Sequence, residues 1–143
     1  MTEQEFRGFL DDICVAFMRP DYALWRTRIQ LPFTIVTATG PVSLANDDEV
    51  KTNFDQYMEA VEILRITDVV REPLKLEHCS DGTVLATYRT HLLSSGTRVH
   101  EPYTSTALLH AHPGQWRMSA ILNALGHHHW TGNAPFLTGE KDD

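Results

Sequence analysis

Residues 83–124 read TVLATYRTHLLSSGTRVHEPYTSTALLHAHPGQWRMSAILNA and carry the clearest structural signal in the chain. This stretch is divided by two pairs of turn residues, Ser95–Gly96 and Pro113–Gly114. The runs between them are rich in apolar and β-branched side chains. Runs of this kind between turn residues predict antiparallel strands joined by hairpins. We therefore expect strands over residues 83–93, 98–112 and 115–124.

Further strand signals lie upstream of this stretch. Residues 66–76 precede a turn at Asp81 and Gly82. Pro73 within them predicts an edge strand or a bulge, because proline has no backbone N–H to donate. Residues 26–45 hold two β-branched runs around Gly40 and Pro41, which predicts another hairpin.

Helices are expected at the N-terminus and in the middle of the chain. Thr2 and Glu5 form a capping box and Pro20 ends the helix, so residues 2–19 are predicted to be helical. A short helical turn or loop follows over residues 21–25. Asn46 and Glu49 predict a second helix, which ends near residue 64. The expected apolar stripes are Phe6, Phe9, Leu10, Ile13 and Phe17 in the first helix, and Val50, Phe54, Tyr57, Met58 and Val61 in the second.

This order of elements is typical of an α+β domain in which helices cover one face of a sheet. The length of 143 residues suits a single core. We therefore assign residues 1–137 to one domain and expect residues 138–143 to form a disordered tail.

Composition and charge argue against several classes of function. The formal net charge is −7, from 12 basic and 19 acidic residues, and the basic residues do not cluster. We therefore expect no nucleic-acid partner and no docking on a membrane. No apolar run reaches the ~18–20 residues that cross a bilayer, and the acidic N-terminus lacks signal-peptide features, so we expect a cytoplasmic protein. Cys14 and Cys79 are expected to be free thiols.

The element order resembles that of the nuclear transport factor 2-like superfamily, with its SnoaL-like and ketosteroid-isomerase-like branches. The resemblance covers residues 3–124 and rests on a helix ending near Asp21, a middle helix, and a meander that closes on GQWRM at residues 114–118. It implies a cone, in which a curved, mainly antiparallel or mixed sheet wraps around the helices and encloses a pocket. It also implies a dimer. The superfamily includes isomerases, cyclases, dehydratases and non-catalytic subunits.

The expected hairpin turns set which side chains share a face of the sheet. They pair Leu109 with Met118 and Thr90 with Glu101, and both hairpins then place Tyr103 on the same face. Pro102 leaves an alternative open, because a bulge there turns Glu101 outward. The face expected to line the pocket contains Val84, Ala86, Tyr88, Thr90, Leu92, Val99, Glu101, Tyr103, Ser105, Ala107, Leu109, Trp116, Met118, Ala120 and Leu122. The opposite, polar face suits water or a homodimer contact.

Glu101 is the candidate general base, because burial in an apolar pocket raises the pKa of a carboxylate towards neutrality. Tyr88 and Tyr103 are candidate donors to an enolate oxygen. The alternative is that Glu101 pairs with an arginine at the sheet edge while both tyrosines fill the core. The other expected ligand contacts are Tyr22, Trp25, Thr90, Ser105, Trp116, Met118 and Leu122.

The chain has 8 histidines, a high number for its length. His110 and His112 share a face of one strand, and a triple histidine follows at residues 127–129. No carboxylate at a matching spacing completes a metal site. We therefore predict no metal and no cofactor, and place these histidines at the surface or at a dimer interface.

The sequence thus predicts a protein that binds a small, mainly apolar molecule. Proton abstraction next to a carbonyl group, in an isomerase, cyclase or dehydratase with a carboxylate base, is one activity consistent with it. The alternatives are a non-catalytic dimeric module with a solid core and an accessory subunit of an oxygenase.

Overall fold

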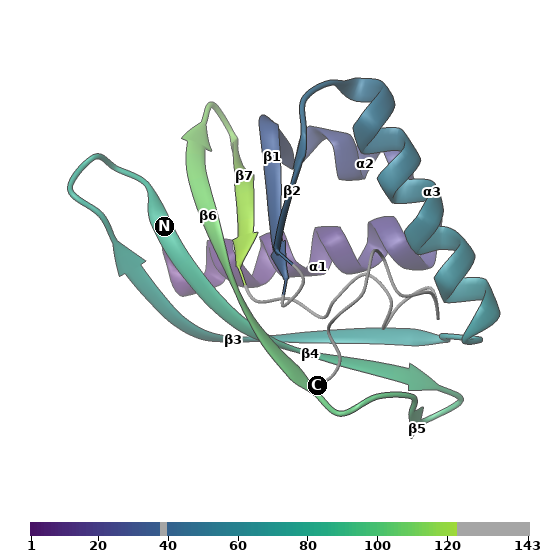
Figure 1. Ribbon diagram of the computed structural model, residues 1–143. Coiled ribbons are helices and arrows are strands. Elements are labelled where there is room, and N and C mark those ends of the chain that lie inside the picture. The colour runs from purple at the N-terminus through teal and green to yellow at the C-terminus, as the bar shows by residue number, and fades with distance from the viewer. Residues whose placement is uncertain (38–39, 123–143) are drawn as a thin grey trace.

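A computed structural model of the protein describes residues 1–37 and 40–122 (Figure 1). A strongly curved sheet forms one layer, and helices lie against its concave side (Figure 1). The helices are α1 (Glu3–Met18), α2 (Tyr22–Thr27) and α3 (Asp47–Ile63). The strands are β1 (Ile29–Thr37), β2 (Gly40–Leu44), β3 (Asp68–His78), β4 (Val84–Ser94), β5 (Thr97–Arg98), β6 (Tyr103–His112) and β7 (Gln115–Leu122). The expected tail at residues 138–143 lies outside the described residues.

The sheet is mixed and has the strand order β2-β1-β7-β6-β4-β3. β1 pairs with β7 in parallel, and the other neighbouring strands, including β5 with β4, pair antiparallel. The predicted α+β class, with a curved mixed sheet against helices, is therefore confirmed. β3 is an edge strand, and its register with β4 shifts between Pro73 and Lys75. Both consequences expected of a proline in this strand are present.

Both long helices begin where the sequence predicts. The Thr2 hydroxyl accepts a hydrogen bond from the backbone N–H of Glu5 at 3.0 Å, and the Glu5 carboxylate accepts one from the N–H of Thr2 at 2.7 Å. At α3, the side chain of Asn46 accepts from the N–H of Glu49 at 3.0 Å. These side chains satisfy backbone donors that have no partner inside the helix.

The register between β6 and β7 agrees with the prediction near the turn and differs from it further along the strands. Leu109 lies opposite Met118 as expected, but Ser119 is an extra residue and the register shifts beyond it. Ile121 therefore lies opposite Ala107 on the concave face. The expected inward position of Leu122 is wrong, because a shift of one residue moves a side chain to the other face and Leu122 is 40% exposed.

The core lies between the helices and the concave face of the sheet. All of the predicted stripe of α1 is buried, and the stripe of α3 is buried at Val50 and Phe54. The ring of Phe17 packs against Trp25 of α2 at 5.0 Å and against Phe54 of α3 at 6.0 Å, measured between centroids. The three helices thus share one aromatic contact. No helix in the described part of the chain is long and apolar enough to cross a membrane.

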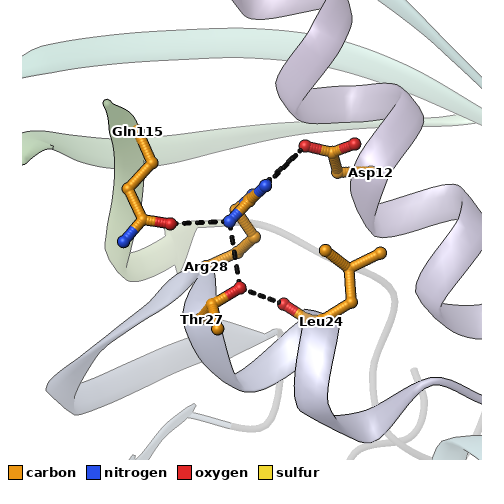
Figure 2. A network of polar contacts seen from close by, with 5 residues as sticks. All are labelled: Asp12, Leu24, Thr27, Arg28 and Gln115. Carbon is orange, nitrogen blue, oxygen red and sulfur yellow. Dashed lines mark hydrogen bonds and ion pairs between the residues drawn. The ribbon is translucent and has the colours of Figure 1, made fainter. Parts of the chain in front are cut away.

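Arg28, directly after α2, joins segments that are far apart in the sequence (Figure 2). Its Nη2 pairs with the carboxylate of Asp12 of α1 at 2.8 Å. Its Nη1 donates to the side chain of Gln115 at the start of β7 at 2.7 Å and to the hydroxyl of Thr27 at 2.9 Å. Thr27 in turn donates to the carbonyl oxygen of Leu24 at 2.7 Å (Figure 2). This network fixes α1 and α2 against the closing strand.

Candidate functional site

Polar side chains from three adjacent strands gather on the concave face of the sheet. Arg71 of β3 lies opposite Thr90 of β4, and Thr90 lies opposite Tyr103 of β6. In the neighbouring row, Tyr88 of β4 lies opposite Ser105 of β6. Tyr88, Thr90 and Ser105 are buried. Because adjacent strands are ~4.8 Å apart, these side chains form one patch.

Tyr57 of α3 adjoins this patch from the helical side. Burial raises the pKa of Tyr57 to about 12, and the neighbouring Tyr88 adds to the rise. Burial also raises the pKa of Tyr88 and that of Tyr103, against the opposing effect of Arg71. All three phenols therefore keep their protons at neutral pH and are hydrogen-bond donors. We call Tyr57, Arg71, Tyr88, Thr90 and Tyr103 the tyrosine–arginine cluster.

Helix α1 holds the guanidinium of Arg71 through two side chains. Nη1 of Arg71 donates to Sγ of Cys14 at 3.2 Å, and the guanidinium carbon lies 5.2 Å from the centroid of the Phe17 ring. Cys14 and Phe17 are three residues apart and so share a face of the helix. Burial opposes the charge of Arg71, but Cys14, Tyr103 and Tyr88 outweigh it and raise the pKa of the guanidinium. Arg71 is therefore a fixed positive charge.

The described residues leave hydrogen-bonding capacity unused in the cluster. Nε of Arg71 and Oγ1 of Thr90 are buried and make no hydrogen bond of normal geometry among these residues, although Thr90 lies near enough to Tyr103 to lower the pKa of its phenol. Oδ1 of Asn53, one helical turn before Tyr57 on α3, is in the same condition. Nε1 of Trp25 and Nε of Arg117 are also buried without a partner among these residues, but do not belong to the cluster. An unsatisfied buried polar atom costs about 1–3 kcal/mol, so those at the cluster need an explanation.

A bulge in β3 determines which charged residue enters the cluster. Leu74 is the extra residue between Pro73, which lies opposite Tyr88, and Lys75, which lies opposite Thr87. A regular strand continued from Lys75 would place Glu72 opposite Thr90 and on the concave face. The bulge places Arg71 there instead. Glu72 lies on the outer face and contacts His91 at 2.8 Å.

The structure brings Tyr88, Thr90, Tyr103 and Ser105 together on the concave face, where the sequence placed them. Their cross-strand partners differ from the expected ones by two residues, because Tyr88 lies opposite Ser105 rather than Tyr103. A shift of two residues preserves the face. Their roles towards a ligand stay predictions.

Glu101 lies outside the cluster. Glu101 is exposed and lies in the segment between β5 and β6. Its backbone carbonyl accepts a hydrogen bond from Nδ1 of His100 at 2.7 Å. The expected pairing of Glu101 with Thr90 is wrong, because Tyr103 takes that position. Pro102 cannot donate to the ladder, so the expected single strand over residues 98–112 is interrupted. The outward alternative is the one observed, and a role for Glu101 as a base stays a prediction.

The remaining predicted contacts are not members of the cluster, although Trp25 packs on Phe17, which adjoins it. Trp116 is half-buried opposite Ala111, eight residues along β6 from Tyr103 and thus about 26 Å away in an extended strand. Met118 is fully buried in the core. Trp25 is 3% exposed among the aromatic rings of the three helices, and Tyr22 packs on Phe54 at 5.4 Å between centroids.

Sequence reasoning missed Arg71 and Asn53 as members of the site and assigned Tyr57 to the core. The sequence holds only part of the information that places Arg71. Val69, Arg71 and Pro73 are two residues apart and so share a face of β3, but which face that is depends on the bulge within the same strand. Tyr57 follows the apolar stripe of its helix, and no local pattern distinguishes it from a core aromatic.

The histidines of the strands are held by single polar partners. Nε2 of His110 contacts the hydroxyl of Ser119 at 2.7 Å, and Nε2 of His112 contacts the side chain of Gln30 at 2.7 Å. Within residues 1–37 and 40–122, no group of three His, Cys, Asp or Glu side chains converges as a metal site would require. The triple histidine at residues 127–129 lies outside the described residues.

Comparison with known proteins finds relatives by structure only. No protein-family model matches the sequence, and no curated protein matches it. Aln2 from a Streptomyces species superposes with a TM-score of 0.64 at 14% identity, over 82% of this chain and 86% of its own. A nuclear transport factor 2-like protein of unknown function from Shewanella oneidensis superposes with a TM-score of 0.63 at 10% identity, over 85% of this chain and 98% of its own. This chain has the nuclear transport factor 2-like fold.

Another similar structure is described as having a cystatin-like fold. A domain of unknown function with a cystatin-like fold from Nostoc punctiforme has a TM-score of 0.61 at 13% identity, over 85% of this chain and 77% of its own. The resemblance inferred from the order of elements is therefore confirmed for the fold. Because the sequence identities are only 10–14%, the comparisons show a shared fold, the nuclear transport factor 2-like fold, and nothing more specific.

Proposed function

We propose that the protein binds a small, mainly apolar molecule at the tyrosine–arginine cluster, between the concave face of the sheet and helices α1 and α3. The observation that carries this proposal is the buried Nε of Arg71 without a hydrogen-bond partner among the described residues, next to the protonated Tyr88 and Tyr103. Stability alone favours apolar side chains at such positions. A molecule that hydrogen-bonds to these groups offsets the cost of burying them.

A carbonyl oxygen is the polar group that best fits phenol donors. Each tyrosine hydroxyl donates one hydrogen bond, and a carbonyl oxygen accepts two. Aromatic rings adjoin the donors: Phe6 lies edge-on to Tyr88 at 6.4 Å and Phe17 lies 5.5 Å from Tyr57, between centroids. Apolar walls with a few convergent polar groups are typical of small-molecule sites.

Proton abstraction next to that carbonyl group is the catalytic form of the proposal. Tyr88 and Tyr103 would stabilise the enolate oxygen, and Glu101 would act as the base. Glu101 is exposed on a segment outside the cluster, so binding does not require it, whereas catalysis does. A Glu101 variant therefore separates the two activities.

β-Tetralone, an apolar ketone with exchangeable protons next to its carbonyl group, is the probe. Calorimetric titration measures its binding, and deuterium uptake from D₂O measures proton abstraction. We expect Tyr103→Phe and Thr90→Val to weaken binding by about tenfold each, the effect of one hydrogen bond. Thr87→Val is the matched control, because Thr87 lies on the same strand but faces outward and bonds to Thr106 at 3.0 Å.

The outcomes separate the alternatives. Equal binding by all of these variants would place the ligand elsewhere, and no binding by the unaltered protein would overturn the proposal. Deuterium uptake that Glu101→Gln abolishes without loss of binding would establish Glu101 as the base. Binding without uptake in the unaltered protein would establish a non-catalytic binding protein.

The outer face of the sheet is the proposed contact of a homodimer. Val70 and Leu122 lie on this face and are 42% and 40% exposed. They adjoin polar residues that already have partners within the chain, such as His91 with Glu72. Sedimentation equilibrium should show a dimer that Leu122→Lys dissociates. A monomer at every concentration would contradict this contact.

A further inference from the structure

Arg71 gives the proposed site a charge preference. We infer that its guanidinium binds a carboxylate, and that the natural ligand is an apolar molecule carrying one negative charge. The inference rests on the proposed binding role of the tyrosine–arginine cluster and specifies its ligand class.

Arg71 has no acidic partner in the described part of the chain, because none of its Asp or Glu side chains forms an ion pair with the guanidinium. Its Nη1 donates to the sulfur of Cys14, which is a weak acceptor. A buried charge without a partner is strongly unfavourable, so an anion at this position stabilises the folded protein.

Several other arginines of the molecule have acidic partners. Arg28 has a carboxylate, an amide oxygen and a hydroxyl as partners (Figure 2). Arg26 pairs with Asp47, Arg7 with Glu3, and Arg89 with Glu72. Arg71 and Arg117 differ from these four, because each has a buried Nε without a hydrogen-bond partner among the described residues. Of these two, Arg71 is the one on the concave face, opposite Thr90.

The guanidinium of Arg71 is held in one orientation. Nη1 of Arg71 is directed to Cys14 and Phe17 packs against the guanidinium, so α1 fixes its orientation. Nε is buried without a partner among the described residues, which leaves the Nε–Nη2 edge for a ligand. The two parallel N–H groups of such an edge match the two oxygens of a carboxylate. Tyr88 and Tyr103 lie near enough to Arg71 to affect the pKa of its guanidinium.

A single carboxylate fits this cluster better than a phosphate. Arg71 is its one cationic member among the described residues, and phosphate sites usually combine several donors with more positive charge. The neighbouring rings of Phe6, Phe17 and Phe54 suit an apolar body. The net charge of −7 disfavours anions in general, so a specific guanidinium is needed to hold one.

The test compares anions with their neutral counterparts of the same shape. Benzoate, naphthoate and anthracenecarboxylate are titrated by calorimetry beside benzamide, naphthamide and anthracenecarboxamide. We expect at least one acid to bind the unaltered protein about tenfold or more tightly than its amide, the effect of a charge-assisted pair. Arg71→Met should reduce this preference to about onefold while still binding the amide.

Controls distinguish a binding role from a structural one. Arg89→Met makes the same chemical change on the outer face of β4 and should keep the preference for the acid. Arg71→Met should unfold at no lower a temperature than Arg89→Met, since among the described residues Arg71 has no acidic partner to lose, whereas Arg89 has Glu72.

Three results would overturn the inference. If the acids and amides bind equally well, the site exists but selects no charge, and the proposed binding function survives alone. If no acid and no amide binds, while β-tetralone does, the site takes neutral ketones. If Arg71→Met unfolds at a lower temperature than Arg89→Met, the guanidinium is part of the structure and not of a site.

Discussion

Tyrosine side chains show most directly how burial changes chemistry in this protein. Of the 4 tyrosines in the chain, Tyr57, Tyr88 and Tyr103 belong to the cluster on the concave face. Their phenols are surrounded by apolar rings and by one another, so the ionised form is disfavoured. These phenols therefore stay protonated, as hydrogen-bond donors, across the whole physiological range of pH.

The raised pKa values predict instability in alkali. Between pH ~10, where an exposed phenol ionises, and the pKa of Tyr57 at about 12, the folded state keeps protons that the unfolded chain releases. The free energy of unfolding is therefore unaffected below pH ~10 and falls as the pH rises above it. Denaturant titrations at neutral pH and at pH ~11 measure this fall.

Tyr57→Phe is the variant that checks the cause. It removes one of the protons retained by the folded state, so its free energy of unfolding should fall less steeply with alkaline pH than that of the unaltered protein. The absorbance of tyrosinate, followed in parallel, should rise together with unfolding. Identical slopes for both proteins would show that Tyr57 ionises freely in the folded state.

Among the elements, β3 shows how one extra residue changes the character of a site. Leu74 bulges from this edge strand, so Pro73 and Lys75 keep consecutive partners on β4. The bulge places the positive Arg71 and not the negative Glu72 beside Thr90 and Tyr103. The preference proposed for a negatively charged ligand thus depends on local strand geometry.

Single-residue deletions in β3 test the bulge. Deleting Leu74 should change the free energy of unfolding by less than about 1 kcal/mol, because the flanking residues then form an unbroken ladder. Deleting Val70, an equally exposed residue of the same strand, is the matched control. It should cost more than about 2 kcal/mol, because buried Val69 turns outward and Asp68 turns towards Leu92. Thermal unfolding of both variants decides, and equal losses would contradict the assigned register.

Across the molecule, Arg28 connects elements that no local signal relates. Asp12 lies 16 residues before it and Gln115 lies 87 residues after it. The backbone carbonyl of Arg28 also accepts a hydrogen bond from the N–H of Met118 at 2.8 Å. The closing strand is thereby attached to both N-terminal helices, at the end of the sheet opposite to the cluster.

Arg28→Met is expected to lower the free energy of unfolding by about 1–2 kcal/mol, since three polar partners lose a donor in a partly buried position. Its side chain is 18% exposed, whereas that of Arg7 is 59% exposed. Arg7→Met removes an exposed pair with Glu3 and should cost less than about 0.5 kcal/mol. Guanidinium unfolding of the two variants measures the difference. A smaller loss for Arg28→Met than for Arg7→Met would show that the network does not stabilise the fold.

Much of this architecture could be predicted from the sequence because it depends on local interactions. The capping side chains of Thr2 and Asn46, the stop at Pro20 and the turn at Pro113 and Gly114 act over a few residues, so their sequence pattern is sufficient. The alternation along β4 likewise predicts that Tyr88 and Thr90 face inward. Helix positions, the α+β class and the inner face of β4 follow from these signals.

The membership of the site depended on contacts between strands that are distant in the chain. The bulge at Leu74, the extra residue Ser119 and the interruption before Tyr103 each shift a register. A shift of one residue exchanges the two faces of a strand, and its position is set by pairing across the sheet and not by the strand's own composition. For that reason folding, and no local pattern, directs Arg71 inward and leaves Glu101 and Leu122 outside.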